Sequence, residues 1–280
     1  MKKLFEIIGL LSLLCFSFII TEKTSLVVKN TDEIMMKIKE EYHKYKKDSK
    51  DATIINNDII PGIYGREVDI NKSYTNMKKY GVYNEDLYVY KDIKPKISIT
   101  DNLDKFIING NQENRNVSII FYTQGNDDIS NIIDIVEKNN IKVNYFVDEK
   151  WFTKNNDLVL KIINDGHIIG NLSNNLDYND TSFSWMNTII KSIGKQKDGY
   201  CYYTNSSENL NTCVLLKNYT IKPLEIDENP YLEIKKNLKP GKIFSFKINN
   251  QLKKELDTII NYIESKGYNI INIEDLIKEN

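Results

Sequence analysis

The chain has 280 residues, of which 41% are hydrophobic and 28% charged, a balance typical of a globular protein. Its formal net charge is -1, from 38 Lys and Arg against 39 Asp and Glu. A general nucleic-acid binder normally carries a basic face, so we expect no nucleic-acid partner. Three cysteines and two histidines leave few ligands for a zinc site built from these two residue types.

Two lysines at the N-terminus precede an apolar stretch, Leu4 to Ile20. This pattern is typical of a secretory signal or a signal anchor. No small-residue cleavage site follows Ile20, which favours an uncleaved anchor over a cleaved signal. The lysines keep the N-terminus in the cytoplasm. We therefore predict a single-pass anchor in the cell membrane over residues 1–21, with the bulk of the chain extracytoplasmic.

Two segments separate this anchor from the main domain. Residues 22–50 carry Ile34, Ile38 and Tyr42 on one helical face, which predicts a helical stalk or a helix packed on the next domain. Residues 51–110 read as a small α+β module of short strands around one helix. Its many tyrosines fit the core of a small domain better than a sugar-stacking face. The polar stretch 109–116 marks a boundary.

The main domain, residues 115–280, alternates strand and helix about seven times. Its first strand, Val117–Tyr122, is uncharged and runs into a turn at Gly125 before an amphipathic helix, as buried parallel strands do. This alternation predicts a parallel sheet or barrel with helices outside. Chemistry in such folds is placed at the carboxyl ends of the strands. Further strands are predicted over residues 141–147, 200–203, 219–226, 242–248 and 268–273, and residues 165–171 are predicted to be a turn followed by a short strand.

Cys201 and Cys213 are the one pair in this domain that could form a bridge. We interpret them as two small buried residues. A disulfide is the alternative, because the predicted location outside the membrane permits one.

Three segments of this domain resemble the polysaccharide deacetylase family, carbohydrate esterase family 4, in order and spacing. They are IKVNYFVDEKWFTKNNDLVLKIINDGHIIGN, PGKIFSFKI and YNIINIEDL. The resemblance covers about residues 115–280. It implies a deformed seven-stranded (β/α) barrel. It also implies an extracytoplasmic metal-dependent enzyme that removes acetyl groups from N-acetylglucosamine in peptidoglycan or chitin-like glycans.

In that family one Asp and two His hold a divalent metal, usually zinc, and a second Asp acts as general base on the metal-bound water. The family's T-F-D-D-G motif falls on residues 121–125, which places Thr123 at the base position and Gln124 at the metal-ligand position. The two metal-binding histidines fall on Leu172 and Leu176. The late catalytic histidine falls on Lys247. Leucine has no lone pair to give a metal, so we expect no cofactor.

We therefore favour a catalytically inactive, membrane-anchored relative that binds cell-wall glycan or another envelope protein. The alternative is an active hydrolase that deacetylates N-acetylglucosamine of peptidoglycan, a carbon-nitrogen bond other than a peptide bond. It would use non-standard groups such as Asp127, Asp128, Asp177 or Lys247. A third interpretation is an unrelated α/β binding domain. No glycine-rich phosphate loop supports a nucleotide site.

Several further residues are candidates for binding. Trp185 and Tyr202 are candidate sugar contacts, although Trp185 also fits a role in helix packing. Asp127 and Asp128 form a possible displaced carboxylate pair, but they also stand where the start of a helix favours acidic residues. We interpret His167 as structural, because it matches a family histidine that is not a metal ligand.

Overall fold

The computed structural model describes residue 11 and residues 17–18, 29–194 and 196–280. Most of the predicted anchor, residues 1–21, lies outside these residues. Within the described ranges, no helix has the length and apolar character needed to cross a membrane. The chain divides into two compact units, Met1–Ser49 with Tyr64–Lys94 and Lys50–Ile63 with Pro95–Asn280.

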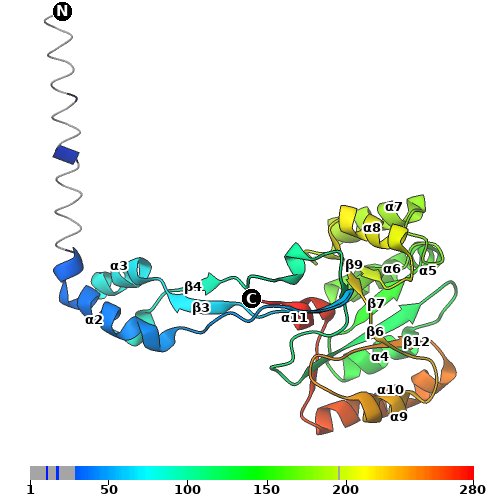
Figure 1. Ribbon diagram of the computed structural model, residues 1–280. Helices are drawn as coiled ribbons and strands as arrows, with labels where there is room; N and C mark the ends of the chain where they lie inside the picture. Colours follow the sequence, from blue (N-terminus) through cyan, green and yellow to red (C-terminus); the bar gives the residue numbers. More distant parts are fainter. Residues whose placement is uncertain (1–10, 12–16, 19–28, 195) are drawn as a thin grey trace, which may run out of the picture. The chain divides into compact units, whose positions relative to one another are not determined.

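The smaller unit combines two helices with an antiparallel strand pair, β3 with β4 (Figure 1). Ile34 and Ile38 of the first helix are buried with Met77 of the second, so the helix predicted in residues 22–50 packs within a folded unit. Asp69 caps the second helix, which ends at Gly81 with a positive φ of 68°. Its elements are α2 (Glu33–Glu41), η1 (Tyr42–Tyr45), β3 (Gly65–Val68), α3 (Ile70–Tyr80), η2 (Glu85–Leu87) and β4 (Tyr90–Ile93).

The predicted module of residues 51–110 does not form one domain, because its strands pair in two different sheets. While β3 and β4 pair with each other, β2 runs parallel to β5, and β5 runs parallel to β10 of the main sheet. Local composition predicts that a segment is a strand but not which partner its backbone will find. The larger unit thus gains β1 (Thr53–Ile55), β2 (Asp58–Ile60), η3 (Ile99–Asp101) and β5 (Phe106–Ile107).

The larger unit has the predicted α/β architecture, built on a curled sheet. Seven strands follow the order β10-β9-β8-β7-β6-β12-β11, and all neighbours in this order are parallel. They are β6 (Asn116–Thr123), β7 (Asn144–Val147), β8 (Ile168–Asn171), β9 (Gly199–Tyr202), β10 (Asn218–Ile221), β11 (Leu224–Ile226) and β12 (Ile243–Lys247). A short strand, β13 (Asn269–Ile270), pairs with the start of β6.

The predicted single strand over residues 219–226 is two strands, and they lie at opposite ends of this order. β10 pairs with β9 whereas β11 pairs with β12, and only Lys222 and Pro223 separate them. Proline has no N–H to donate to a strand ladder, so it interrupts the pairing. Because two residues cannot span a flat sheet of this width, the sheet must curl until its two ends approach.

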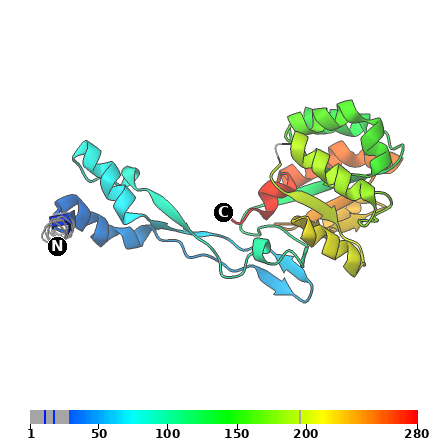
Figure 2. The same ribbon diagram turned by 90° about the horizontal axis from the view of Figure 1, so that it is seen from above.

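Helices cover the outer side of this sheet, as Figures 1 and 2 show. Alternate residues of β6 face opposite sides: Ile119 and Phe121 pack with the helices, whereas Ile120 and Tyr122 join an inner cluster. The outer helices are α4 (Ser130–Lys138), α5 (Glu149–Lys154), α6 (Asn156–Asn164), α7 (Thr181–Ile193), α8 (Ser207–Leu215), α9 (Pro230–Asn237) and α10 (Asn250–Ser265). The short helix α11 (Ile273–Ile277) instead contributes its buried side chains to the inner cluster.

Cys201 on β9 and Cys213 on α8 form a disulfide, with their Cα atoms 6.5 Å apart. The interpretation as two small free thiols is therefore wrong, although both residues are fully buried. The bond ties α8 to the sheet beside Tyr178 and Phe183, whose rings stack at 4.5 Å between centroids. Spacing in the sequence could not show that helix and strand would bring the two sulfur atoms together.

His167 is buried before β8, where its Nδ1 accepts a hydrogen bond from the backbone N of Val143 at 3.2 Å. The ring also meets Tyr145 edge-on. Burial, helped by the nearby charge of Lys142, lowers the pKa of His167 to about 4. This geometry fits a structural role, because protonation would remove the acceptor that Val143 uses.

Removing the disulfide should destabilise the larger unit. In the chain-entropy account, a bridge over a sequence separation of 12 stabilises by about 3 kcal/mol. We expect urea unfolding to show that the double variant Cys201→Ala/Cys213→Ala has a free energy of unfolding lower by this amount. Reduction of the wild type should lower its free energy of unfolding equally. A variant that unfolds at the wild-type urea concentration would contradict this expectation.

The stability of the protein should fall as pH drops from about 6.5 to 4, in part through His167. The pKa of His167 is 6.5 in the unfolded chain and about 4 in the folded protein. Between these pH values the unfolded state binds a proton that the folded state does not bind, which stabilises the unfolded state. Above pH 6.5 neither state is protonated and the contribution is constant. Urea unfolding at pH 7 and pH 5 should show a loss about 1–2 kcal/mol smaller in His167→Gln than in the wild type. Equal losses in the two proteins would show that His167 does not titrate in this way.

Candidate functional site

A pocket of about 180 Å³ opens among the carboxyl ends of the strands of the larger unit. β6, β9, β11 and β12 contribute to its wall, together with the loop after β8. This is the position where parallel α/β folds usually place a ligand. The lining residues are Tyr122, Leu176, Tyr202, Tyr203, Glu225, Asp227, Ser245 and Lys247.

Strand register explains why the charged side chains meet here. Glu225 of β11 is the parallel partner of Ser245 of β12, and residues two positions apart in a strand share a face. Asp227 therefore follows Glu225 toward the pocket, and Lys247 follows Ser245. The alternating segments LEID and FSFK carry this signal in the sequence. Because the sequence predicts one strand over residues 219–226, it does not by itself place Glu225 and Asp227 beside Lys247.

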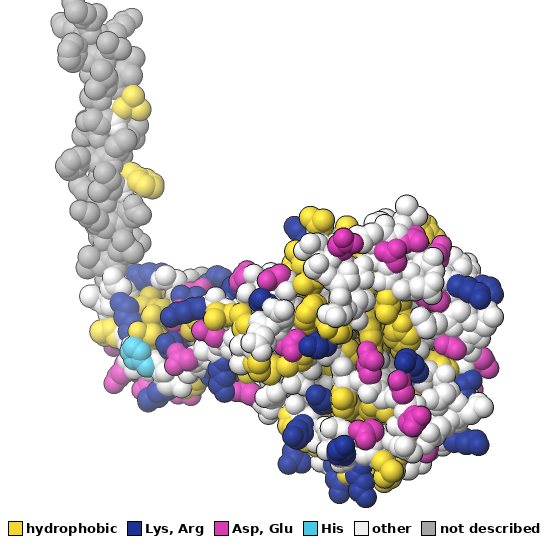
Figure 3. Space-filling model, turned by 45° about the vertical axis from the view of Figure 1, so that its right-hand side comes forward, with side chains coloured by type: hydrophobic (Ala, Val, Ile, Leu, Met, Phe, Trp, Pro, Cys, Tyr) yellow, Lys and Arg dark blue, Asp and Glu magenta, His cyan; other side chains and the backbone are white. Residues whose placement is uncertain are grey.

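The pocket contains one ion pair and one further carboxylate. Lys247 Nζ lies 3.1 Å from the carboxylate of Asp227. Glu225 is exposed, and no basic side chain of the described residues pairs with it. Elsewhere on the larger unit, acidic and basic side chains are interspersed over the face seen in Figure 3.

Two buried tyrosines form the floor of the pocket. The hydroxyl of Tyr202 donates to Ser245 Oγ at 2.9 Å, and Gln124 Nε2 donates to the hydroxyl of Tyr122 at 3.1 Å. Burial, together with the nearby charges of Glu225 and Asp148, raises the pKa of Tyr122 to about 12. Burial also raises the pKa of Tyr202. Both hydroxyls are therefore neutral near pH 7.

The three predicted degenerate ligand positions gather around Tyr122. Gln124 reaches its hydroxyl, and Leu172 is fully buried in the same cluster as Tyr122 and Tyr202. Leu176 packs on that cluster and lines the pocket, one turn after Leu172, whose backbone O accepts from Leu176 N at 3.0 Å. Side chains from two loops, the turn after β6 and the loop after β8, thus converge at this end of the sheet.

These residues do not fit the divalent metal that the family resemblance implies. Two of the three positions have hydrocarbon side chains, and the amide of Gln124 is already engaged with Tyr122. A hard or borderline cation needs oxygen, nitrogen or thiolate ligands. In the part of the chain that the structure describes, no three His, Cys, Asp or Glu side chains are grouped to hold a metal. Thr123 is fully buried, and its hydroxyl donates to the backbone O of Phe121 at 3.3 Å.

Asp127 and Asp128 do not line the pocket, because both support the local backbone. Asp127 accepts from the backbone N of Gln124 at 2.8 Å, and burial raises its pKa. Asp128 accepts from Ser130 N at 3.0 Å at the start of α4, and these hydrogen bonds lower its pKa. Asp128 is therefore an acidic residue at the start of a helix, as the second interpretation of this pair expected.

The carboxylate of Asp148, which the sequence reasoning did not single out, holds the turn beside the pocket. Its two oxygens accept from Gly125 N at 3.0 and 2.9 Å, and one also accepts from Trp151 N at 2.7 Å. The sequence signal was its position directly before a helix, as a cap.

The other predicted residues divide between the pocket and its surroundings. Tyr202 lines the pocket, whereas Trp185 does not and packs edge-on against Phe152 of α5. That contact matches the helix-packing alternative for Trp185, although 45% of the residue is exposed. Asp177 is exposed, and its side chain accepts from Asn179 N in the loop before α7.

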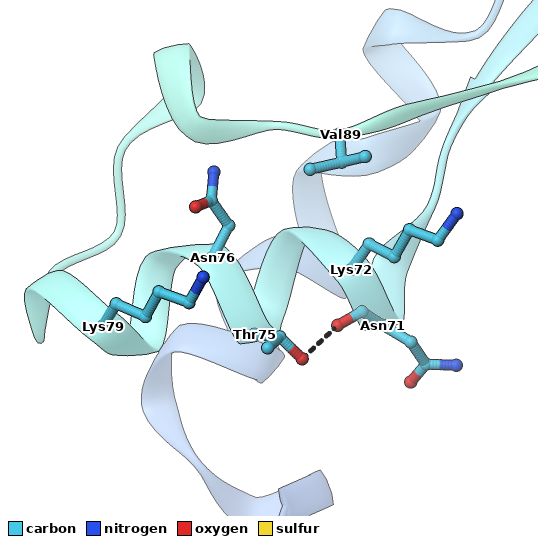
Figure 4. Close-up of a pocket in the computed structure, with 6 residues that line it drawn as sticks. All are labelled: Asn71, Lys72, Thr75, Asn76, Lys79 and Val89. Carbon is cyan, nitrogen blue, oxygen red and sulfur yellow. Dashed lines mark hydrogen bonds between the residues drawn. The ribbon is translucent and has the colours of Figure 1, made fainter.

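A second hollow, of about 420 Å³, lies on α3 of the smaller unit (Figure 4). Lys72 and Lys79 border it with polar side chains of the same helix, and Val89 closes one side. Its one drawn hydrogen bond is local, from Thr75 Oγ1 to the backbone O of Asn71. Exposed lysines along one helix are typical of a solvated face, so we assign no ligand here.

Comparisons with known proteins agree with this geometry. Residues 109–224 match the family model described as polysaccharide deacetylase. The uncharacterised protein YlxY of Bacillus subtilis is 34% identical over 117 residues. That match covers 41% of this chain and 37% of YlxY, so this chain spans little more than a third of the relative's length.

Solved structures share the fold at lower sequence identity. BA3943 of Bacillus anthracis, described as a CE4 family pseudoenzyme, is 21% identical with a TM-score of 0.63, over 89% of this chain and 96% of its own. A mutant of BA3943 is described as having restored enzymatic activity. PdaA of Bacillus subtilis, a family 4 carbohydrate esterase, is 19% identical with a TM-score of 0.54, over 61% and 84%. Residues 109–224 therefore resemble the polysaccharide deacetylase family in sequence, and the larger unit shares the fold of these solved structures.

Proposed function

We propose that this protein is a non-catalytic relative of the polysaccharide deacetylases that binds cell-wall glycan through the pocket around Tyr122 and Tyr202. One observation carries this proposal: Leu172 and Leu176, at the positions of the two metal-binding histidines, pack into the inner cluster. Without ligands for a cation, the family's metal-bound nucleophile has no place to form. The similar fold of the pseudoenzyme BA3943 supports the same conclusion.

The location we propose is the outer face of the cell membrane. The motivating pattern is the pair of lysines followed by the apolar stretch Leu4 to Ile20. The disulfide between Cys201 and Cys213 supports a location outside the cytoplasm, where such bonds persist. Cell-wall glycan is the partner that fits both this location and the family, with another envelope protein as the alternative. We expect no nucleic-acid partner.

The competing function is an active peptidoglycan deacetylase that uses unusual groups. The pair Lys247 and Asp227 is the observation in its favour, because both lie at the pocket. Their mutual ion pair leaves no general base next to an activated water. Metal content and acetate release separate the two functions.

Restoring the three ligands should restore metal binding. We expect the wild type to retain no stoichiometric zinc after loading and gel filtration. The variant Gln124→Asp/Leu172→His/Leu176→His should retain about one zinc per chain by elemental analysis, because the three positions surround Tyr122. The matched control Leu160→His/Leu215→His alters two exposed leucines and should bind none. Stoichiometric zinc in the wild type, or acetate released by it from peptidoglycan, would refute the non-catalytic function.

Filling the pocket should weaken glycan binding. The wild type should sediment with insoluble peptidoglycan, and Leu176→Trp should reduce the bound fraction at least about fivefold, since an indole would occupy much of the 180 Å³. Leu215→Trp, at a residue that is 80% exposed on α8, is the matched control and should bind as the wild type does. If the wild type fails to sediment, the glycan-binding function is wrong.

A further inference from the structure

We propose that the pocket selects glycans whose glucosamine carries a free, protonated amino group, in preference to the N-acetylated sugar. This inference rests on the proposed function and names the ligand of the same pocket. The protein would then recognise the product of deacetylation, whereas its active relatives consume the substrate.

The charge of the pocket favours a cationic ligand. Its lining holds two carboxylates, Glu225 and Asp227, and one ammonium group, Lys247. Asp227 neutralises Lys247 at 3.1 Å, so Glu225 is left as a carboxylate that no described basic side chain pairs. A primary ammonium group would complete this set with charge-assisted hydrogen bonds. A neutral acetamide gains no such interaction.

The negative potential of Glu225 extends to the floor of the pocket. Its charge acts on the hydroxyls of both Tyr122 and Tyr202, which it helps to raise in pKa. The two rings meet edge-to-face with centroids 5.1 Å apart, and Tyr203 lines the same space. Tyrosine faces attract cations, and their apolar surfaces stack on sugar rings. The wall therefore suits a ring that bears a positive charge.

The size of the pocket and the leucines at positions 172 and 176 also favour an amino sugar with a free amine. About 180 Å³ is below the range of about 300–1,000 Å³ typical of larger ligands, so the pocket has room for one sugar ring and favours an amine over the bulkier acetamide. A resident divalent cation would repel an ammonium group within a few ångströms. With leucines at positions 172 and 176, that repulsion is absent while the carboxylates of β11 remain.

Binding of two tetrasaccharides tests the inference directly. Calorimetry at low salt should show glucosamine tetramer binding several-fold more tightly than N-acetylglucosamine tetramer, with the preference shrinking at high salt because both carboxylates are exposed. Glu225→Gln should weaken glucosamine binding by about two- to fivefold, the effect of a partly exposed ion pair. Lys247→Gln removes the basic partner of Asp227 and should strengthen glucosamine binding by a similar factor.

Matched controls distinguish the preference for an amine from glycan binding itself. Glu264→Gln removes the same charge from an exposed position on α10 and should bind as the wild type does. Tighter binding of the N-acetylated tetramer, or unchanged binding by Glu225→Gln, would refute the amine preference while glycan binding stands. Equal binding of a lysine-rich peptide would show that the pocket recognises amines without the sugar. If neither tetramer binds, the inference and the proposed function both fail.

Discussion

The two-residue connection between β10 and β11 is the constraint on which the rest of the larger unit depends. Lys222 and Pro223 join strands that lie at opposite ends of a seven-strand parallel order, so the sheet has to curl. Curling brings the carboxyl ends of β6, β9, β11 and β12 together around the pocket. It also encloses the inner cluster that contains Tyr122, Leu172 and Tyr202. Without this curl, Glu225 and Tyr202 would lie at opposite edges of a flat sheet.

At this end of the sheet, hydrogen bonds and packing hold the residues that the family resemblance aligns with a metal site. Gln124 is held by the hydroxyl of Tyr122, and the backbone of the turn is held by Asp127 and Asp148. Leu172 and Leu176 place hydrocarbon side chains at positions where the family resemblance implies metal ligands. The turn after β6 and the loop after β8 are thus held by contacts within the protein, without a metal ion. The same fold can carry different functions, because function depends on the side chains of the site.

Three charged side chains of the pocket lining determine its net charge. The ion pair of Asp227 with Lys247 neutralises two of the three charged groups, and Glu225 gives the pocket its net sign. Aromatic walls and a carboxylate that no described basic side chain pairs suit an amino sugar.

The sequence by itself determined the strand and helix alternation, the family resemblance and the absence of donor atoms at residues 172 and 176. These are local properties: periodicity follows from the spacing of apolar residues, and leucine lacks lone pairs in any fold. Only the tertiary structure decided which strands pair, and therefore that residues 53–60 join the main sheet and that 219–226 is split. It also decided the Cys201–Cys213 bond and the meeting of Glu225 with Tyr202. These contacts join segments distant in the chain, and no local pattern specifies which segments the curled sheet will bring together.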